Sequence, residues 1–221
     1  MSRRQSNEAK STINIAVETS VRYPGLLGQV KRSVNYVIPE SYDGDLILTI
    51  RDSYDETDTF SKKNQKNITF GFYYTNESTY QNALIDLYLV PHLQGIPKVF
   101  WWSTVPTILF ARTIAHEMAH HIYLCRNELC YVTNSSDVIE GVANNYARDV
   151  LNQMRKERKY RLGFWWVKEI AFWHYSLGIL DFRENKYASS ADHFFYAWKL
   201  DPRLDGVASR YWAAIDKLSS S

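Results

Sequence analysis

One segment of the chain, Thr113 to Ile122, combines residue types and a spacing that can hold a metal ion. His116, Glu117 and His120 form the pattern His-Glu-x-x-His. On a helix with about 3.6 residues per turn, the first and fifth residues project from one face, so both imidazoles can reach one ion. Glu117 would then lie beside a metal-bound water and act as its base. The pattern predicts a metal centre.

The helix that must carry this pattern has a clear beginning. Ser103 or Thr104 can cap it, and Pro106 suits its first turn. A second helix is predicted from about Ser136 to Arg158. It ends in a run of basic residues, which we interpret as complementing the negative end of the helix dipole rather than as a nucleic-acid contact.

The region before this helix mixes one helix with strands. Apolar residues recur at helical spacing between Pro24 and Ile38, which predicts a helix there. Three β-rich runs follow and predict three strands. These runs are Leu46 to Arg51, Ile68 to Tyr74 and Ala83 to Val90.

A catalytic zinc ion normally has three protein ligands and a water, so a third ligand is needed. The metzincin arrangement would require glycine at Tyr123 and histidine at Arg126, and that class is therefore excluded. Glu140 lies twenty positions after His120 on the predicted second helix. This spacing resembles that of the gluzincins, the thermolysin-like zinc metallopeptidases, in which a downstream glutamate completes the site.

The order of the elements strengthens this resemblance. An N-terminal helix, a small β-sheet, the His-Glu-x-x-His helix and a glutamate helix resemble the compact gluzincins known as minigluzincins, over roughly Pro24 to Arg158. The implied fold class is α+β and zincin-like, with a C-terminal helical extension. The resemblance implies one Zn²⁺ per chain held by His116, His120 and Glu140, with Glu128 as a competing carboxylate. It further implies hydrolysis of peptide bonds, with Glu117 as general base on a zinc-bound water.

The same resemblance suggests roles for residues around the metal. Tyr131 has the offset of a tyrosine that stabilises the oxyanion in thermolysin, while His174 and Tyr175 are alternatives. Asn144 occupies the position of a residue that hydrogen-bonds a ligand histidine. The strand Ala83 to Val90 corresponds to the edge strand that would pair with a peptide or protein substrate.

Beyond Gly163 the chain is strongly aromatic and helical in pattern. Residues such as Gly178, Phe194 and Ala197 resemble one tetratricopeptide repeat, although Ser190 departs from it. We predict a helical hairpin and a last helix from Val207 to Leu218. The expected domains are a disordered tail over 1–10, a metallopeptidase domain over 11–163 and the extension over 164–221.

The extension leaves two functional hypotheses open. In one, the aromatic extension covers the cleft and keeps the enzyme latent. In the other, the chain is a non-enzymatic interaction protein that binds a protein partner through the extension, with a structural zinc or none. Surface attachment of the extension to a membrane is a third, weaker hypothesis.

Composition limits the classes of partner and the compartment. The net charge of +2 is too small to predict a nucleic-acid partner. We find neither a signal peptide nor a good membrane-spanning run, so we expect a cytoplasmic protein without stable membrane insertion. Cys125 and Cys130 are expected to be reduced thiols, with a local disulfide as the alternative.

Overall fold

The strands of the protein follow alternating apolar residues, and its helices follow apolar residues at spacings of three and four. The computed structural model describes residues 12–42, 44–53, 70–74, 82–126 and 136–220. The fold is α+β, as predicted, with a small four-stranded sheet and mostly helical structure elsewhere. The described elements are β1 (Ile13–Glu18), α1 (Leu26–Val37), β2 (Asp45–Arg51), β3 (Gly71–Tyr74), β4 (Asn82–Tyr88), α2 (Leu89–Gln94), the 3₁₀-helix η1 (Lys98–Phe100), α3 (Val105–Arg126), α5 (Ser136–Lys156), α6 (Arg158–Arg183), α7 (Tyr187–Leu200) and α8 (Val207–Ser219).

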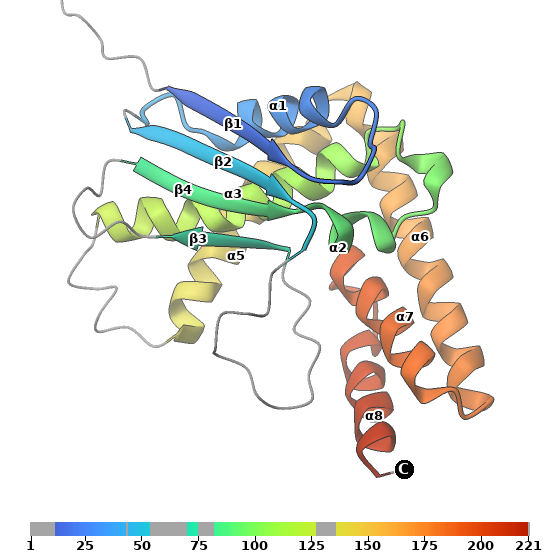
Figure 1. Ribbon diagram of the computed structural model, residues 1–221. Helices are drawn as coiled ribbons and strands as arrows, with labels where there is room; N and C mark the ends of the chain where they lie inside the picture. Colours follow the sequence, from blue (N-terminus) through green and yellow to red (C-terminus); the bar gives the residue numbers. More distant parts are fainter. Residues whose placement is uncertain (1–11, 43, 54–69, 75–81, 127–135, 221) are drawn as a thin grey trace, which may run out of the picture. The chain divides into compact units, whose positions relative to one another are not determined.

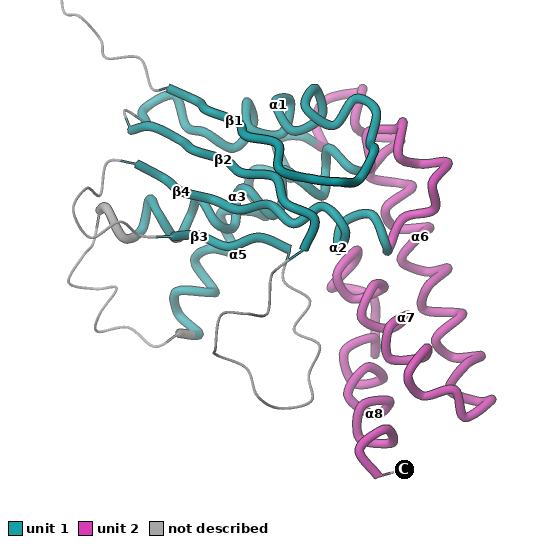
Figure 2. The backbone as a smooth tube through the Cα atoms, in the orientation of Figure 1, with its two compact units in different colours: residues 1–94, 106–154 teal, residues 95–105, 155–221 magenta. Residues whose placement is uncertain are grey.

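The chain forms two compact units, which Figure 2 distinguishes by colour. Unit 1 contains residues 1–94 and 106–154, and unit 2 contains residues 95–105 and 155–221. We expected the C-terminal extension to begin at residue 164. Unit 2 instead includes residues from 155 and residues 95–105 with η1, and the centroid of the Phe100 ring lies 4.7 Å from that of the Trp166 ring on α6.

Unit 1 is built around the sheet, whose strand order is β1-β2-β4-β3. β1, β2 and β4 are parallel, and β3 runs antiparallel to β4. One face is apolar, because alternate residues such as Leu48 and Ile85 are buried. Figure 1 shows α1 and α3 on one face of the sheet. The buried Ser33 hydroxyl donates to the Thr107 carbonyl at 2.8 Å and joins these two helices.

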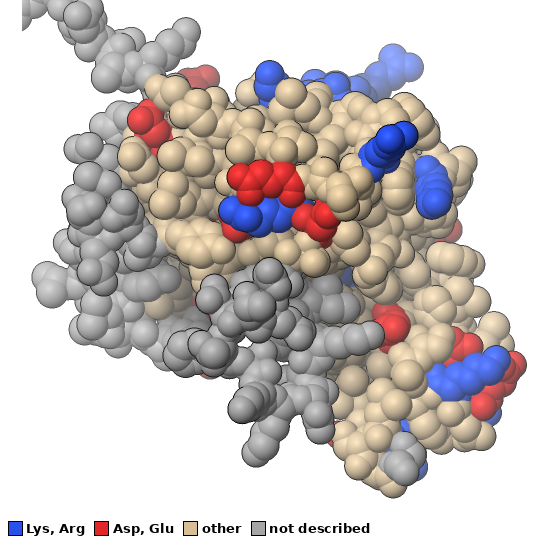
Figure 3. Space-filling view, viewed as in Figure 1, with Lys and Arg blue, Asp and Glu red and all other residues tan. Residues whose placement is uncertain are grey.

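The other face of the sheet carries a row of polar side chains across all four strands. Glu18 on β1 pairs with Arg51 on β2 at 3.0 Å, and Arg51 Nε lies 2.9 Å from Asp86 Oδ2 on β4. The Tyr74 hydroxyl on β3 donates to the same carboxylate at 3.0 Å. Figure 3 shows acidic and basic side chains gathered on this face. The row therefore links all four strands on this face.

Most predicted elements are confirmed, with three corrections. β1 was missed, although Ile13, Ile15 and Val17 alternate with less apolar residues. The strand predicted to Val90 ends at Tyr88, because α2 begins at Leu89 with Pro91 in its first turn. The predicted edge strand is wrong as well, since β4 lies between β2 and β3, and β3 is an outer strand.

Unit 2 contains the predicted hairpin, α6 and α7, followed by α8. A methyl group at Gly178 of α6 would lie 2.8 Å from the Phe194 ring of α7, so the glycine permits this close packing. The buried Ser190 hydroxyl donates to the Gly178 carbonyl at 2.8 Å. The hairpin and the last helix are thus confirmed, and the likeness to a tetratricopeptide repeat stays a prediction.

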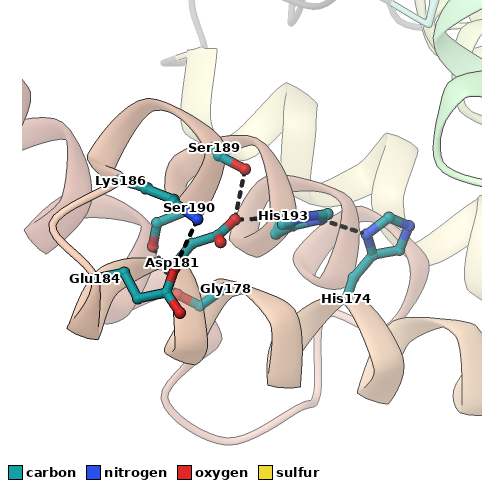
Figure 4. A network of polar contacts seen from close by, with 8 residues as sticks. All are labelled: His174, Gly178, Asp181, Glu184, Lys186, Ser189, Ser190 and His193. Atoms are coloured by element: carbon teal, nitrogen blue, oxygen red, sulfur yellow. Dashed lines mark hydrogen bonds and ion pairs between the residues drawn. The ribbon is translucent and has the colours of Figure 1, made fainter.

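A polar network crosses the hairpin (Figure 4). His174 of α6 is buried, and burial lowers its pKa to about 4, so the imidazole is neutral. Its Nε2 must donate to the Gly95 carbonyl, 3.0 Å away, and its Nδ1 therefore accepts from His193 Nδ1 at 3.0 Å. Asp181 lies 3.7 Å from His193 Nε2 and accepts a hydrogen bond from Ser189. Each ring nitrogen of His174 thus has a matched partner.

None of the helices in the described part of the chain combines the length and the apolar character that a membrane crossing requires.

Candidate metal centre

Two helices of unit 1 bring together the three predicted ligands. His116 and His120 lie one turn apart on α3, with their Nε2 atoms 3.2 Å apart. Glu140 lies on α5, with Oε2 3.2 Å from His116 Nε2 and Oε1 3.4 Å from His120 Nε2. Ligand atoms of these three residues all lie within 4.8 Å of one another, which is close enough to hold a metal ion.

The separations suit a small tetrahedral ion. Zinc bonds to imidazole nitrogen and carboxylate oxygen at about 2.0–2.2 Å, which places tetrahedral ligand atoms ~3.3 Å apart. The three measured separations lie close to this value. Two imidazoles and one carboxylate are also the ligand types of catalytic zinc sites. The donor set therefore fits zinc.

The environment of His120 favours the neutral imidazole that a metal requires. The side chain is buried, and this burial lowers its pKa, while Glu140 has the smaller, opposing effect. Since Nε2 faces the other ligands, Nδ1 should carry the proton. This Nδ1 is buried and has no hydrogen-bond partner among the described residues. Asn144 is exposed and does not hydrogen-bond His120 Nδ1. The prediction that Asn144 hydrogen-bonds a ligand histidine is therefore wrong for His120.

Glu117 lies on the same helix and has an unusual carboxyl group. Burial raises its pKa to about 7, and the nearby Glu140 adds to the rise. A backbone hydrogen bond from Tyr73 opposes the shift. A carboxyl group with a pKa near 7 can both take up and release a proton near neutral pH.

Strand β3 passes close over Glu117 because it carries a glycine there. A methyl group at Gly71 would lie 2.6 Å from Thr113 Cγ2 and 3.2 Å from Glu117 Cγ. Thr113 cannot easily move, because its hydroxyl lies 2.8 Å from His92 Nε2. His92 is buried and neutral, with a pKa lowered to about 4, and its Nδ1 donates to the Tyr88 carbonyl at 2.6 Å.

A second histidine, His121 on α3, also joins this helix to β3. His121 Nδ1 lies 2.9 Å from the Tyr73 hydroxyl, and its Nε2 lies 3.1 Å from the Tyr42 hydroxyl. The Tyr42 hydroxyl donates to the Asp45 carbonyl, so it accepts from His121 Nε2, and Tyr73 donates to Nδ1. Burial lowers the pKa of His121 to about 4, which agrees with a neutral ring.

The remaining predicted site residues form two groups. Tyr131, Glu128 and Cys130 lie outside the described residues. The two alternatives for the oxyanion donor belong to unit 2, where both nitrogens of His174 are bonded and the Tyr175 hydroxyl accepts from Arg210 Nε at 2.9 Å.

Sequence reasoning missed four residues that position the centre, namely Gly71, Tyr73, His92 and His121. A glycine inside a β-rich run is a recognised signal for close backbone approach, so Gly71 could have been found. The hydrogen bonds of His92 and His121 join segments far apart in the sequence, and no local pattern predicts them.

Comparisons of the chain with protein-family models, with curated proteins and with solved structures found no match.

Proposed function

We propose that the protein is a zinc-dependent hydrolase of peptide bonds, of the gluzincin type. The observation that carries the proposal is the convergence of His116, His120 and Glu140, with a carboxyl group of raised pKa at Glu117 on the same helix. A bound zinc ion would supply a Lewis acid that activates water and polarises a carbonyl. The other parts of the chemistry belong to side chains of this chain.

Glu117 would take the proton of the attacking water and deliver it to the leaving amine. Both transfers need a carboxyl group whose pKa lies near the working pH, which is the value that burial gives it. The backbone of Tyr73 hydrogen-bonds this carboxyl group, and Gly71 leaves room for β3 to pass beside the Glu117 side chain. Thr113 and His92 support the same contact. The general base is thus restrained before substrate arrives.

The substrate would be an extended peptide that pairs with β3. This strand is an outer strand of the described sheet and lies next to Glu117. An outer strand can offer its backbone groups to an added strand, which positions a peptide without demanding a particular sequence. This role moves the proposed substrate strand from β4 to β3.

The test is hydrolysis of an unstructured peptide library by the full chain with zinc, with products read by mass spectrometry. Glu117→Gln should retain zinc and lose about a hundredfold to ten-thousandfold in kcat, because the base is removed and the ligands remain. Asp149→Asn is the matched control, since Asp149 is exposed on α5. It should leave hydrolysis unchanged.

Two outcomes would contradict the proposal. Equal hydrolysis by the Glu117→Gln variant would show that Glu117 is not the base. Stoichiometric zinc without hydrolysis of any peptide would instead favour the interaction protein with a structural zinc.

A further inference from the structure

Helix α6 is apolar on two opposite faces. Its buried face carries apolar residues at helical spacing, such as Phe164, Val167 and Ala171. The opposite face is exposed and also carries large apolar side chains. Leu162 is 63% exposed and Phe172 is 58% exposed, and the further members are Trp165, Trp173 and Leu180. A surface helix normally carries polar residues on its exposed face, so the apolar residues on this outer face indicate a binding surface.

The spacing of these residues makes one continuous stripe. Steps of three, four and seven residues return to the same side of a helix, and Leu162, Trp165 and Phe172 follow such steps. The stripe extends to Leu180, so it runs for about 27 Å along a single helix. It is a straight ridge, which suits a flat surface.

Segment η1 extends the apolar surface at the beginning of α6. The Phe100 ring packs on Trp166, whose ring is 4.5 Å from that of Trp165. This contact brings the neighbours of Phe100 towards the stripe. Among them, Val99 is 75% exposed and Trp102 is 72% exposed.

The same outer face is positively charged. Helical spacing places Arg158, Arg161, Lys168 and Arg183 on it, all exposed, against one acid, Glu169. No salt bridge joins these four basic residues to an acid within the described ranges. The net charge of the whole chain is small, so this imbalance is local. The surface complements a partner that is both anionic and apolar.

We propose that this outer face of α6, with η1, docks on an anionic phospholipid bilayer. Exposed tryptophan, phenylalanine and leucine can enter the boundary between head groups and acyl chains, and arginine and lysine can bind the phosphates. The attachment is peripheral and independent of the zinc site.

The test is sedimentation of the full chain with vesicles of phosphatidylcholine, with and without phosphatidylserine. The wild type should bind the phosphatidylserine vesicles and bind pure phosphatidylcholine at least about tenfold more weakly. Arg158→Glu with Arg161→Glu should weaken binding by more than tenfold, since each basic residue near an anionic surface contributes about fivefold. Arg203→Glu with Lys217→Glu, both exposed outside α6, should leave binding within about threefold of the wild type.

A second pair of variants tests the contribution of the apolar side chains to vesicle binding. Trp165→Ser with Phe172→Ser should abolish binding, whereas Trp212→Ser, an exposed tryptophan on α8, should not. Circular dichroism and thermal melting check that each variant is folded. Zinc content and hydrolysis should be the same in all of them, which separates this proposal from that of the enzyme.

Three results would overturn the proposal. The wild type could fail to bind phosphatidylserine vesicles, or it could bind equally after Trp165→Ser with Phe172→Ser. The wild type could also dimerise without lipid and fail to bind vesicles, with the Trp165→Ser, Phe172→Ser double variant being monomeric. The last result would assign the surface to a second copy of the chain.

Discussion

Each unit brings one pair of histidines together, and the two pairs differ in what surrounds them. In unit 1, His116 and His120 meet through Nε2 atoms 3.2 Å apart, and both face the carboxylate of Glu140. In unit 2, His174 and His193 meet through Nδ1 atoms 3.0 Å apart. Their other nitrogens face the Gly95 carbonyl and Asp181.

The difference lies in the balance of donors and acceptors. In unit 2, a proton on His174 Nε2 and one on His193 Nδ1 account for the two shortest contacts, so each of these contacts pairs one donor with one acceptor. In unit 1, two imidazole nitrogens and two carboxylate oxygens converge on one point, and neutral imidazoles offer too few protons for them. Close histidines alone therefore do not define a metal site. An excess of converging acceptors is the feature that favours the proposed metal site.

Removing the carboxylate from each histidine cluster should give the largest difference between the two clusters, measured as the loss of zinc affinity. Glu140→Ala should weaken zinc binding by more than about a hundredfold, because a ligand matters more than an outer hydrogen bond. Asp181→Ala, the matched change in unit 2, should leave zinc affinity unchanged. Competition with a fluorescent zinc chelator measures both. Similar losses in the two variants would remove the distinction between the clusters.

The neutral state of His174 in unit 2 can be tested by the pH dependence of the protein's stability. The pKa of His174 falls from 6.5 to about 4 on folding. The unfolded chain therefore takes up a proton first as the pH falls, so the free energy of unfolding decreases between about 6.5 and about 4. The decrease should reach ~3 kcal/mol at the lower end.

His174→Gln isolates this contribution, because glutamine can donate to Gly95 and cannot be protonated. Thermal unfolding of the variant should depend less on pH than that of the wild type, and the difference should be confined to this window. Parallel curves for the two proteins would mean that His174 is not held neutral.

Two glycines at close contacts should give a smaller contrast. Gly71→Ala would push against Thr113 and Glu117, so we expect hydrolysis to slow by about tenfold to a hundredfold with zinc retained. Gly178→Ala would push against Phe194, and it should lower the free energy of unfolding by about 1–3 kcal/mol without slowing hydrolysis. Peptide hydrolysis and chemical denaturation of both variants check this. Slower hydrolysis by the Gly178→Ala variant would contradict this contrast. So would a loss of hydrolysis in the Gly71→Ala variant that its loss of stability fully explains.

Local patterns in the sequence were enough to predict most elements. Helical spacing correctly predicted α1, which buries one apolar face, and the prediction of α3, α5 and the α6–α7 hairpin is also confirmed. It also predicted that His116 and His120 share a face. The approach of Glu140 to both histidines came from a resemblance in spacing, and the structure places these three side chains together.

Contacts between distant segments could not be predicted in this way. The strand order depends on which strands pair, so β4 was taken for an outer strand. Thr113 only marks the beginning of the segment that carries the motif, and its bond to His92 needs α2 to fold beside α3. His121 is not part of the His-Glu-x-x-His pattern, and it joins two tyrosines from separate segments. Such roles depend on tertiary structure.

The central claim is that the histidine pair of unit 1, and not that of unit 2, holds one zinc ion. The most direct measurement is the zinc content of the full chain by native mass spectrometry. The wild type and the His174→Ala, His193→Ala double variant should each carry one zinc per chain, and the His116→Ala, His120→Ala double variant should carry none. Zinc retained without His116 and His120, or absent from a zinc-saturated wild type, would contradict the claim.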